Sequence, residues 1–552
     1  MNAAVCRDGI DILVSILKAN GIKKIIVSPG ATNAEIVSSM QKDGSFELYS
    51  CIDERSAAYM ACGLAAASGE AVAISCTGST ASRDYLPGLT EAYYRKLPII
   101  AITSSKSFVN DGNLVPQYID RSVLPNDVVK LSVHLPVVQG ETDARYCELQ
   151  VNRAISELSR EGGGPVHINI ATRFSEKDRS VCCDARTIEY YNLWDEIPTV
   201  LEDDKRIIIT IGAQRKCTDR LKESIDRFCE KYNAVVLVDH SSRYFGKYRV
   251  HPTLLLSQET DYSDKLIPDL IIHIGEQSGD YFTYNWLMGK AEVWRVSKDG
   301  RLKDTFQRLT RVYEGPEEVF FEKYSSYKKE KLDNLYYKQW LSTMSMLPDV
   351  PELPFSNVWI AKEMVKKIPD GSIVHLGVSN TMRSWTFFDF ISDISVYANV
   401  GARGIDGAVS SLVGHSFVDK NKLCFGVFGD LTFFYDMNAL GNRHISNNLR
   451  ILLINNGGGT EFNLYFHYAK RICSDVNRYI AASGHNGNKS EELVKHYVTD
   501  LGFDYLKADD KESFIRNLGV FLSQKPDGKS ILFEVFTNHN DESEAVRIIR
   551  NL

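Results

Sequence analysis

The chain has 552 residues, a formal net charge of −7 and 44% hydrophobic residues. This length is too great for one hydrophobic core and suggests about three domains. Acidic and basic residues are interspersed, which excludes a basic field for nucleic acid and a polybasic patch for a membrane, so small anionic substrates must be attracted by local groups.

Three apolar runs in the first third of the chain are typical of buried parallel strands: Lys24 to Val27, Val72 to Ser75 and Ile99 to Thr103. The stretches between them are amphipathic or rich in alanine, as in Ser56 to Ala67, and are expected to be helices. This alternation predicts a doubly wound α/β domain.

The first domain is expected to end after one more strand. Gly162 to Pro165 leads into the apolar run Val166 to Ile170, and the polar stretch Ser175 to Asp184 is expected to be a linker. A second α/β unit follows without a G-x-G-x-x-G motif after any strand, so no dinucleotide fingerprint is present. Its expected strands are Ile207 to Ile211, Val235 to Val238, Leu270 to Ile274 and Val293 to Val296.

The last third of the chain repeats the alternation of strands and helices. Pro348, Pro351 and Pro354 mark its beginning, and it continues from about Ser356 to the C-terminus. The predicted fold class is therefore α/β, with three doubly wound parallel-sheet domains over residues 1–180, 190–345 and 355–552.

Two features indicate where the protein is found. The eleven cysteines include no metal-type C-x-x-C pair, and the adjacent Cys182 and Cys183 cannot easily bridge each other, so reduced thiols are expected. The N-terminal stretch carries an acid and no cleavage-site pattern, and the chain has no run of about 18 apolar residues. These observations predict a soluble, cytoplasmic protein.

Polar residues follow two neighbouring apolar runs in the last third. Asp430 comes after the run Leu423 to Phe428, and Asn456 follows Ile451 to Ile454, about 26 residues further on. Mg²⁺ prefers oxygen ligands and keeps phosphate oxygens among them, while glycines let the backbone approach closely. The pairs Gly-Asp and Asn-Asn, which contain these residues, are also common in turns. Their occurrence together after two strands nevertheless predicts a site for a cation and a diphosphate.

The motif GDL, followed by NN, resembles the thiamine diphosphate (ThDP) enzymes, whose cofactor motif reads GDG and then NN. The version here, GDLTFFYDMNAL and INNGGG, is most similar to the MenD family (2-succinyl-5-enolpyruvyl-6-hydroxy-3-cyclohexene-1-carboxylate synthases), which joins 2-oxoglutarate to isochorismate. The resemblance covers nearly the whole chain. It implies pyrimidine-binding, central and diphosphate-binding domains in this order, with ThDP and Mg²⁺ as cofactors.

The segment Asp53 to Ala58 resembles the MenD segment that supplies the glutamate of the cofactor site, which assigns this role to Glu54. In ThDP enzymes this glutamate shares a proton with N1′ of the aminopyrimidine, and the 4′-imino nitrogen then removes the proton at C2 of the thiazolium. Read alone, the segment favours an ordinary charged first turn of a helix, and it is the accompanying cofactor motif that favours the role of Glu54.

The stretch Tyr397 to Gly407 resembles the MenD segment that bends the cofactor, which gives Ile405 the role of a wedge beneath it. The alternative is a core isoleucine in a glycine-rich turn. In ThDP enzymes the glutamate and metal domains meet across a subunit interface. The resemblance therefore implies a homodimer or homotetramer, in which Glu54 of one chain serves Asp430 and Asn456 of another.

The carboxylate-binding residues depart from the MenD pattern. Thr32 stands where SPGSR has its arginine, Lys106 replaces a second arginine and Val400 a third. Arginine presents a planar fork that fits a carboxylate, whereas lysine offers only a point charge. A 2-oxo acid remains the expected donor, but the acceptor is expected to differ from isochorismate.

Three residues still match the family's substrate contacts. Ser379 and Arg383 match the serine and arginine that hold the acidic tail of the donor, and Gln117 resembles an active-site glutamine. Arg383 could equally be a charge on a helix surface, and Gln117 a loop residue.

The segment Thr460 to Lys470 could form a lid through Tyr465, His467 or Tyr468. Alternatively, it could pack an aromatic face on the core.

No histidine pair of the kind found in simple decarboxylases occurs between Ser104 and Arg121, which favours ligation over release of an aldehyde. The leading hypothesis is a Mg²⁺- and ThDP-dependent carboligase that decarboxylates a 2-oxo acid. The alternatives are an authentic MenD, a simple 2-oxo acid decarboxylase and, more remotely, a non-catalytic protein with this fold.

The residues expected to form the site are, for catalysis, Glu54 and Ile405; for the cofactor, Glu54, Ser379, Ile405, Gly429, Asp430, Leu431, Thr432 and Asn456; for the substrate, Thr32, Lys106, Gln117, Ser379 and Arg383; and for the metal, Asp430, Asn456 and Gly458.

Overall fold

The structure of the chain is a computed structural model. It describes residues 8–105, 108, 118–172, 185–198, 201–202, 204–214, 217–260, 263–328, 330–390, 394–485, 489–523 and 528–552. Lys106, Gln117, the pair Cys182 and Cys183, and the expected linker Ser175 to Asp184 lie outside these residues.

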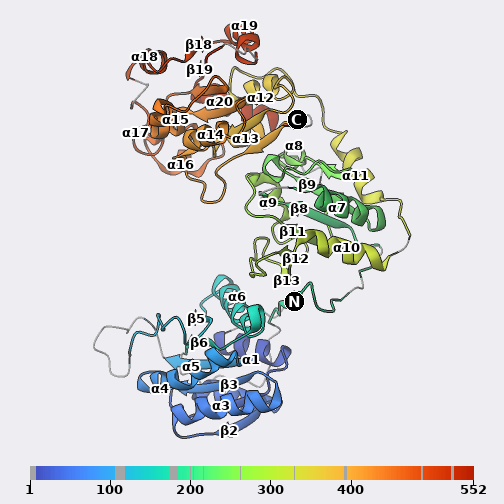
Figure 1. The fold of residues 1–552 in the computed structure, drawn as a ribbon, viewed down its shortest axis with the longest axis vertical. Coiled ribbons are helices and arrows are strands. Elements are labelled where there is room, and N and C mark those ends of the chain that lie inside the picture. Colours follow the sequence, from blue (N-terminus) through green and yellow to red (C-terminus); the bar gives the residue numbers. More distant parts are fainter. Residues whose placement is uncertain are drawn as a thin grey trace. The chain divides into compact units, whose positions relative to one another are not determined.

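The chain divides into two compact units, whose helices and strands are labelled in Figure 1. One comprises residues 1–195 with the short segments 299–304 and 309–314, and the other comprises residues 196–298, 305–308 and 315–552. Three sheets are present in the described part of the chain, and every strand pairing that joins neighbouring strands of the first and third sheets is parallel. The predicted α/β class with parallel sheets is therefore confirmed.

The first sheet has six strands in the order β2-β1-β3-β4-β6-β5. Its strands are β1 (Lys24–Val27), β2 (Glu47–Ser50), β3 (Val72–Thr77), β4 (Ile99–Ser105), β5 (Leu131–Leu135) and β6 (Val166–Ala171). Its helices are α1 (Gly9–Ala19), α2 (Ala34–Asp43), α3 (Glu54–Ser68), α4 (Thr80–Asp84), α5 (Leu86–Arg95) and α6 (Glu141–Glu157), with the short η2 (Arg160–Gly162).

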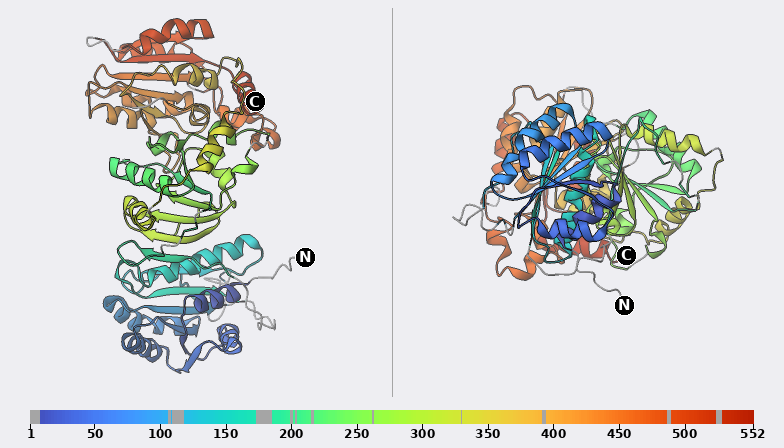
Figure 2. Two further views of the ribbon diagram at one scale, coloured as in Figure 1. Left: turned by 90° about the vertical axis from the view of Figure 1, so that its right-hand side faces the viewer. Right: turned by 90° about the horizontal axis from the view of Figure 1, so that it is seen from below.

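Helices cover both faces of this sheet, because successive strand residues enter two separate cores (Figure 2). Ile100 and Ile102 of β4 pack with residues of α1 and α6, whereas Ile99 and Ala101 pack with residues of α3 and α5. Side chains of a strand alternate between faces, so β4 reads as a continuous apolar run because both of its faces are buried.

The second sheet has seven strands in the order β10-β9-β8-β11-β12-β13-β7. Its strands are β7 (Glu189–Asn192), β8 (Ile207–Ile211), β9 (Ala234–Val238), β10 (Arg249–Val250), β11 (Leu270–Ile274), β12 (Glu292–Ser297) and β13 (Leu309–Glu314). The associated helices are α7 (Asp219–Lys231), α8 (Thr253–Leu256), α9 (Tyr281–Leu287), α10 (Glu317–Tyr327) and α11 (Leu335–Met344), with η3 (His240–Ser242) and η4 (Asp264–Leu266).

The third sheet has the order β15-β14-β16-β17-β19-β18. Its strands are β14 (Ile373–Leu376), β15 (Ser395–Tyr397), β16 (Cys424–Gly429), β17 (Leu449–Asn455), β18 (Asp504–Ala508) and β19 (Ile531–Phe536). Its helices are α12 (Asn357–Met364), α13 (Asn380–Trp385), α14 (Ala408–Ser416), α15 (Asp430–Asp436), α16 (Tyr468–Ile472), α17 (Val476–Tyr479), α18 (Leu493–Asp500), α19 (Lys511–Phe521) and α20 (His539–Ile549), with η5 (Met437–Gly441) and η6 (Thr460–Asn463).

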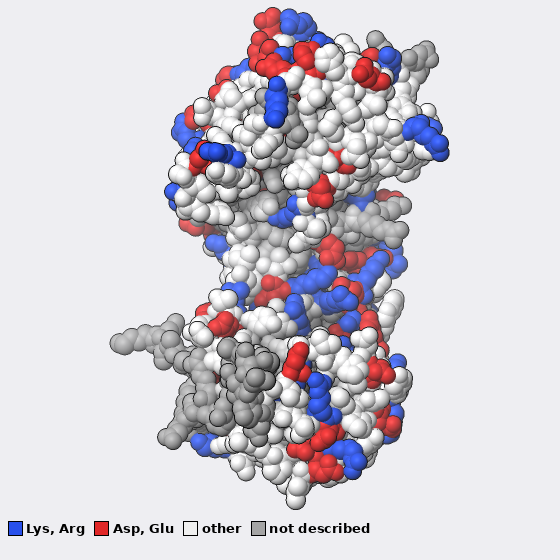
Figure 3. All heavy atoms as spheres, turned by 90° about the vertical axis from the view of Figure 1, so that its left-hand side faces the viewer, with Lys and Arg blue, Asp and Glu red and all other residues white. Residues whose placement is uncertain are grey.

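The surface carries no single dominant charge on the face shown in Figure 3, where acidic and basic side chains occur side by side. In the part of the chain that the structure describes, no helix combines the length and the apolar character that a membrane span requires. None of the eight cysteines with a described environment forms a disulfide in the structure.

Candidate functional site

The candidate site lies at the carboxyl edge of the third sheet. The chain passes from β14 outward to β15 and then returns to β16 on the other side of β14, so the strand order reverses between β14 and β16. Ligands of open α/β sheets bind beyond the carboxyl ends of the strands at such a reversal. The segments that leave β14, β16 and β17 there contain Ser379, Asp430 and Asn456.

A cavity of about 150 Å³ opens at this point. It receives residues from the ends of three strands and from the segment before α14. The residues that line it are Val378, Ser379, Asn380, Thr381, Ile405, Gly429, Asp430, Leu431, Thr432, Asn456, Gly458, Gly459, Thr460, Glu461 and Phe462. Every residue that the sequence assigned to the metal, and every cofactor residue except Glu54, is among them.

Three buried oxygen atoms of residues that line this cavity have no hydrogen-bond partner: Oδ2 of Asp430, Oδ1 of Asn456 and Oδ1 of Asn380. Asp430 is 2% exposed, and its other carboxylate oxygen accepts a hydrogen bond from the backbone N–H of Leu431 at 2.7 Å. Burial raises the pKa of Asp430 to about 7, although backbone N–H groups oppose this rise. Buried oxygens without partners are costly unless a ligand satisfies them, and a carboxylate with an amide oxygen fits Mg²⁺.

The loop after β17 requires glycine at Gly458. Its φ is +152°, and a Cβ atom would lie 2.5 Å from Oγ of Ser483 and 2.7 Å from the carbonyl oxygen of Ala481. The neighbouring Gly459 N–H donates to the same Ala481 carbonyl at 2.6 Å. The loop is thus held against the segment around Ala481, which keeps Asn456 and the Gly458 backbone at the cavity.

The floor of the cavity combines apolar and polar groups. Ile405 is half-buried and lies two residues before Gly407, the left-handed residue that precedes α14. Ser379, which precedes α13, has a φ of +67°, an uncommon conformation for a residue other than glycine. Such backbone strain occurs preferentially at ligand sites.

A buried carboxylate that the sequence analysis missed lies behind the metal-type residues. Glu542 of α20 is fully buried and accepts hydrogen bonds from the Asn357 N–H at 3.0 Å and the Thr537 hydroxyl at 2.7 Å. It also accepts from the amides of Asn380, at 3.4 Å, and Asn456. Burial raises the pKa of Glu542. Its position in an ordinary helix gave no sequence signal for this role.

The sequence-assigned residues of the other compact unit lie at the carboxyl edge of the first sheet. Glu54 is half-buried at the start of α3, where the preceding Asp53 accepts hydrogen bonds from the Arg55 N–H at 3.1 Å and the Ser56 hydroxyl at 2.6 Å. The hydroxyl of Thr32 lies 2.6 Å from that of Thr77. This unit therefore positions Glu54 by a helix cap and holds Thr32 in a hydroxyl cluster.

Arg383 has a partner within the chain. Its guanidinium forms an ion pair with the carboxylate of Glu461, and the side chains are 9% and 16% exposed. Glu461 lines the cavity, whereas Arg383 does not.

Val400, which stands where the MenD pattern has an arginine, is buried at 4% exposure.

The segment Thr460 to Lys470, which follows the loop that contains Gly458, does not form one continuous helix. It consists of η6, an irregular stretch and α16. Tyr465 packs against the core and its hydroxyl bonds to Arg550 at 2.8 Å, while Tyr468 is exposed and stacks on His467 at 5.0 Å between ring centroids. For Tyr465, packing on the core is therefore confirmed.

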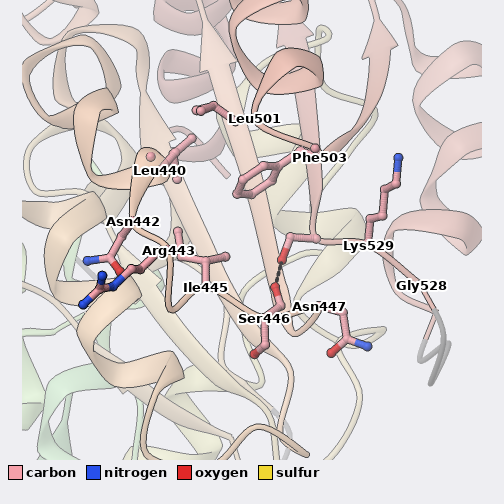
Figure 4. Close-up of a pocket in the computed structure, with 13 residues that line it drawn as sticks. Leu440, Asn442, Arg443, Ile445, Ser446, Asn447, Leu501, Phe503, Gly528 and Lys529 are labelled. Atoms are coloured by element: carbon pink, nitrogen blue, oxygen red, sulfur yellow. Dashed lines mark hydrogen bonds between the residues drawn. The ribbon is translucent and has the colours of Figure 1, made fainter.

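A larger cavity of about 410 Å³ lies at the opposite, amino edge of the same sheet, among residues that precede β17, β18 and β19 (Figure 4). Arg443 and Lys529 are among its lining residues. None of the described residues that line it is Asp or Glu, so it offers no carboxylate for a cation. Size alone does not identify a site, and the converging oxygens of Asp430 and Asn456 favour the smaller cavity.

His240, His251 and Asp389 could approach a common metal ion, because their ligand atoms lie within 4.8 Å of one another. However, Nε2 of each histidine lies within hydrogen-bond distance of a backbone carbonyl, and Arg249 binds both carboxylate oxygens of Asp389. These contacts hold the cluster together without an ion.

The comparisons with known proteins agree with this geometry. Residues 7–124 match the family described as thiamine pyrophosphate enzyme, N-terminal TPP binding domain. Together with the cation-type cavity at the edge of the third sheet, this match defines the chain as a thiamine diphosphate-dependent enzyme.

Curated relatives extend the similarity to nearly the full length. The 2-succinyl-5-enolpyruvyl-6-hydroxy-3-cyclohexene-1-carboxylate synthases of Bacteroides fragilis and Bacteroides thetaiotaomicron are each 30% identical to this chain, over 561 and 558 residues, which is 97% of both chains in each comparison. The synthase of Flavobacterium johnsoniae is 28% identical over 561 residues, 95% of both chains. The chain belongs to this synthase family, as the GDL and NN motifs indicated.

Proposed function

We propose that the protein is a Mg²⁺- and ThDP-dependent carboligase that decarboxylates a 2-oxo acid and transfers the resulting acyl carbanion equivalent to an acceptor. The observation that carries this proposal is the pair of buried oxygens without partners, on Asp430 and Asn456, which face one cavity in a member of a ThDP-dependent synthase family.

In this proposal, the residues assigned to the metal would hold the cation and, through it, the diphosphate. Asp430 and Asn456 would provide a carboxylate and an amide oxygen, and the backbone carbonyl of Gly458 would add a third ligand. Asp430 contributes one negative charge, so the bound cation keeps a positive charge for phosphate oxygens. Leu431 and Thr432 follow Asp430 at the start of α15 and would border the diphosphate.

Glu54 would hold a proton at N1′ of the aminopyrimidine, and Ile405 would contact the cofactor with its apolar side chain. Bound ThDP supplies a carbon nucleophile and a sink for the electron pair released with CO₂. Ile405 also keeps this side of the cavity apolar, which excludes water from the reacting atoms. By the family pattern, Glu54 would come from a second subunit, so the active unit would be a homodimer or homotetramer.

The substrate contacts suggest a changed acceptor. Two residues that would otherwise be arginine, Thr32 and Val400, cannot bind a carboxylate through a guanidinium, and Lys106 offers a point charge. Gln117 and Ser379 would provide neutral hydrogen bonds. An authentic MenD reaction with 2-oxoglutarate and isochorismate is the second candidate, favoured by the 30% identity over 97% of the chain.

The proposal is tested first at the cofactor. With Mg²⁺ and ThDP bound, the protein should accelerate hydrogen–deuterium exchange at C2 of ThDP, followed by NMR after acid quench. Glu54→Gln should slow this exchange by about 100-fold, the typical contribution of one proton-transfer group. Glu70→Gln, at an exposed glutamate of the same compact unit, is the matched control and should exchange like the wild type.

A protein that leaves the exchange rate of free ThDP unchanged would contradict the catalytic proposal, and so would equal rates in Glu54→Gln and the wild type. A second assay separates the candidate reactions. CO₂ release from a series of 2-oxo acids identifies the donor, and rapid consumption of isochorismate would replace the proposed reaction by the authentic MenD reaction. CO₂ release with a free aldehyde as the sole product would indicate a simple decarboxylase.

A further inference from the structure

The charges around the cavity at the carboxyl edge of the third sheet are few. Among the described residues that line it, Asp430 and Glu461 are the only charged ones, and none is Lys or Arg. Asp430 is assigned to the cation in the proposed function. Glu461 is therefore the one remaining charge among the described residues of this chain that line the cavity.

Glu461 is placed by the ion pair with Arg383. The guanidinium lies behind the carboxylate, 5.7 Å from the ring centre of Phe466 and 5.5 Å from that of Tyr281. The two exposures, 9% for Arg383 and 16% for Glu461, leave little water to screen a further charge. The positive charge of Arg383 is thus neutralised inside the protein before any ligand enters.

The uncharged residues that line the cavity include groups that suit an uncharged tail. Val378 and Phe462 provide apolar surface. Asn380 lines the cavity with a buried amide oxygen, Oδ1, that has no hydrogen-bond partner. An aliphatic tail, or a tail with a neutral hydrogen-bond donor, would satisfy this surface without a new charge.

We propose that Glu461 is a specificity-determining residue that restricts the donor to 2-oxo acids with an uncharged tail. A ligand with a second carboxylate would either lie beside Glu461, which adds like-charge repulsion, or displace it from Arg383 and leave it without its partner. Both are costly in a site with little water. This inference rests on the proposed function and replaces the sequence-based expectation that Ser379 and Arg383 hold an acidic tail.

The test compares two donors of equal chain length, 2-oxopentanoate and 2-oxoglutarate, which differ only in the terminal carboxylate. The wild-type enzyme with Mg²⁺ and ThDP should release CO₂ from 2-oxopentanoate with a kcat/KM about 100-fold higher than from 2-oxoglutarate, because like charges at close range discriminate strongly. Glu461→Gln frees Arg383 and should shift this ratio toward 2-oxoglutarate by about 100-fold. Glu512→Gln, at an exposed glutamate of α19, is the matched control.

A second measurement does not depend on turnover. Calorimetric titration of the Mg²⁺- and ThDP-loaded protein with glutarate should show binding to Glu461→Gln that is about 10-fold tighter than to the wild type. Replacement of both partners, Arg383→Met with Glu461→Leu, should remove this gain.

The outcomes separate the inference from the proposed function. A wild-type preference for 2-oxoglutarate, which needs no variant, overturns the inference and leaves the carboligase proposal intact. Equal glutarate affinities in Glu461→Gln and the wild type also overturn it, whether or not any donor reacts. Tighter glutarate binding to Glu461→Gln in a protein that releases no CO₂ from any 2-oxo acid supports the charge assignment and contradicts the carboligase proposal.

Discussion

At the scale of single residues, Glu542 explains how the Asn456 amide is oriented. The carboxylate accepts a hydrogen bond from the Asn456 side chain, so the amide nitrogen points toward Glu542 and Oδ1 points to the cavity without a partner. The same carboxylate accepts from Asn380 at 3.4 Å. An amide can turn by 180° with little change of shape, and an acceptor on one side selects the orientation that offers oxygen to a cation.

The substitution Glu542→Gln should weaken Mg²⁺ binding. The new side-chain NH₂ faces the amide nitrogen of Asn456 and favours the reversed amide, which presents NH₂ to the cation. Loss of an outer partner of a metal ligand typically lowers metal affinity by about 10- to 100-fold. Mg²⁺ titration of the ThDP-loaded protein should therefore show this loss, while kcat at saturating Mg²⁺ should recover most of its wild-type value.

Glu544→Gln on the same helix is the matched control, since Glu544 is exposed and pairs with Arg547. A Glu542→Gln protein with wild-type Mg²⁺ affinity would refute the positioning role. A kcat that stays low at all Mg²⁺ concentrations would instead indicate general damage to the cavity.

The sequence predicted the convergence of Asp430 and Asn456 because each follows a buried strand, and the ends of adjacent parallel strands meet at one edge. It could not predict Glu461 or Glu542 as neighbours of the site. Arg383 and Glu461 are 78 residues apart, and their pairing depends on how η6 folds back over α13. A glutamate without a strand end or a repeated spacing carries no local signal for such a contact.

At the scale of elements, an ion-pair cluster joins the edge strand β10 to the segment after α13, within one compact unit. Arg249 of β10 donates to both oxygens of Asp389, one of them at 2.6 Å, and His251 lies 3.9 Å from the same carboxylate. His240 stacks on His251 at 4.8 Å and lies 3.1 Å from the Trp385 carbonyl. The contact thus anchors α13, the helix that follows Ser379.

The substitution Asp389→Asn should destabilise this unit by about 1–3 kcal/mol, because Arg249 loses the anion that accepts two charge-assisted hydrogen bonds. Urea unfolding followed by tryptophan fluorescence measures the change, since Trp385 is fully buried beside the cluster. Glu363→Gln, in the exposed pair with Lys367, should cost less than about 0.5 kcal/mol. Equal midpoints for the two variants would show that the cluster adds no stability.

The strands were easier to predict from the sequence than the segments between them. The expected runs Lys24 to Val27, Ile207 to Ile211 and Leu270 to Ile274 agree with β1, β8 and β11, since strands with both faces buried leave an unbroken apolar run. The segment after Asn456 gave two competing interpretations, because aromatic residues suit both a lid and a core. For Tyr465, the contacts with Arg550 and with the core show that the side chain packs on the core.

At the scale of the whole molecule, the first and third sheets share one strand order. Counted along each sheet, both run 2-1-3-4-6-5. Both sheets therefore reverse their strand order at the same place, and each presents assigned residues at its carboxyl edge: Glu54 and Thr32 in one compact unit, Asp430 and Asn456 in the other. The same strand order thus occurs in two sheets of the chain, and the loops beyond the strands determine what each sheet binds.

Buried histidines occur throughout the described chain and should make the whole molecule sensitive to acid. Burial lowers the pKa of His167 in β6, His240 in η3 and His375 in β14 to about 3 each. In the unfolded chain, histidine has its ordinary pKa of about 6.5. Below that pH the unfolded state binds more protons than the folded state. The contribution of these neutral histidines to the free energy of unfolding is therefore complete above about pH 6.5 and is lost as the pH falls toward 3.

Each of these histidines should reduce the free energy of unfolding by about 2 kcal/mol between pH 7.5 and pH 5.0. His240→Gln isolates one contribution. The glutamine amide can still donate to the Trp385 carbonyl but does not titrate, although His251, Asp389 and Arg249 still surround the position. Because the fixed cost of the substitution is the same at both pH values, only the difference between them reports the titration.

Denaturant unfolding at pH 7.5 and pH 5.0, at constant ionic strength, should show a pH-dependent loss that is smaller in His240→Gln than in the wild type by about 2 kcal/mol. His444→Gln, at an exposed histidine, should keep the wild-type loss. If His240→Gln loses as much stability as the wild type on acidification, protonation of this buried ring does not drive the acid sensitivity, and the carboxylates paired in the folded state must account for it.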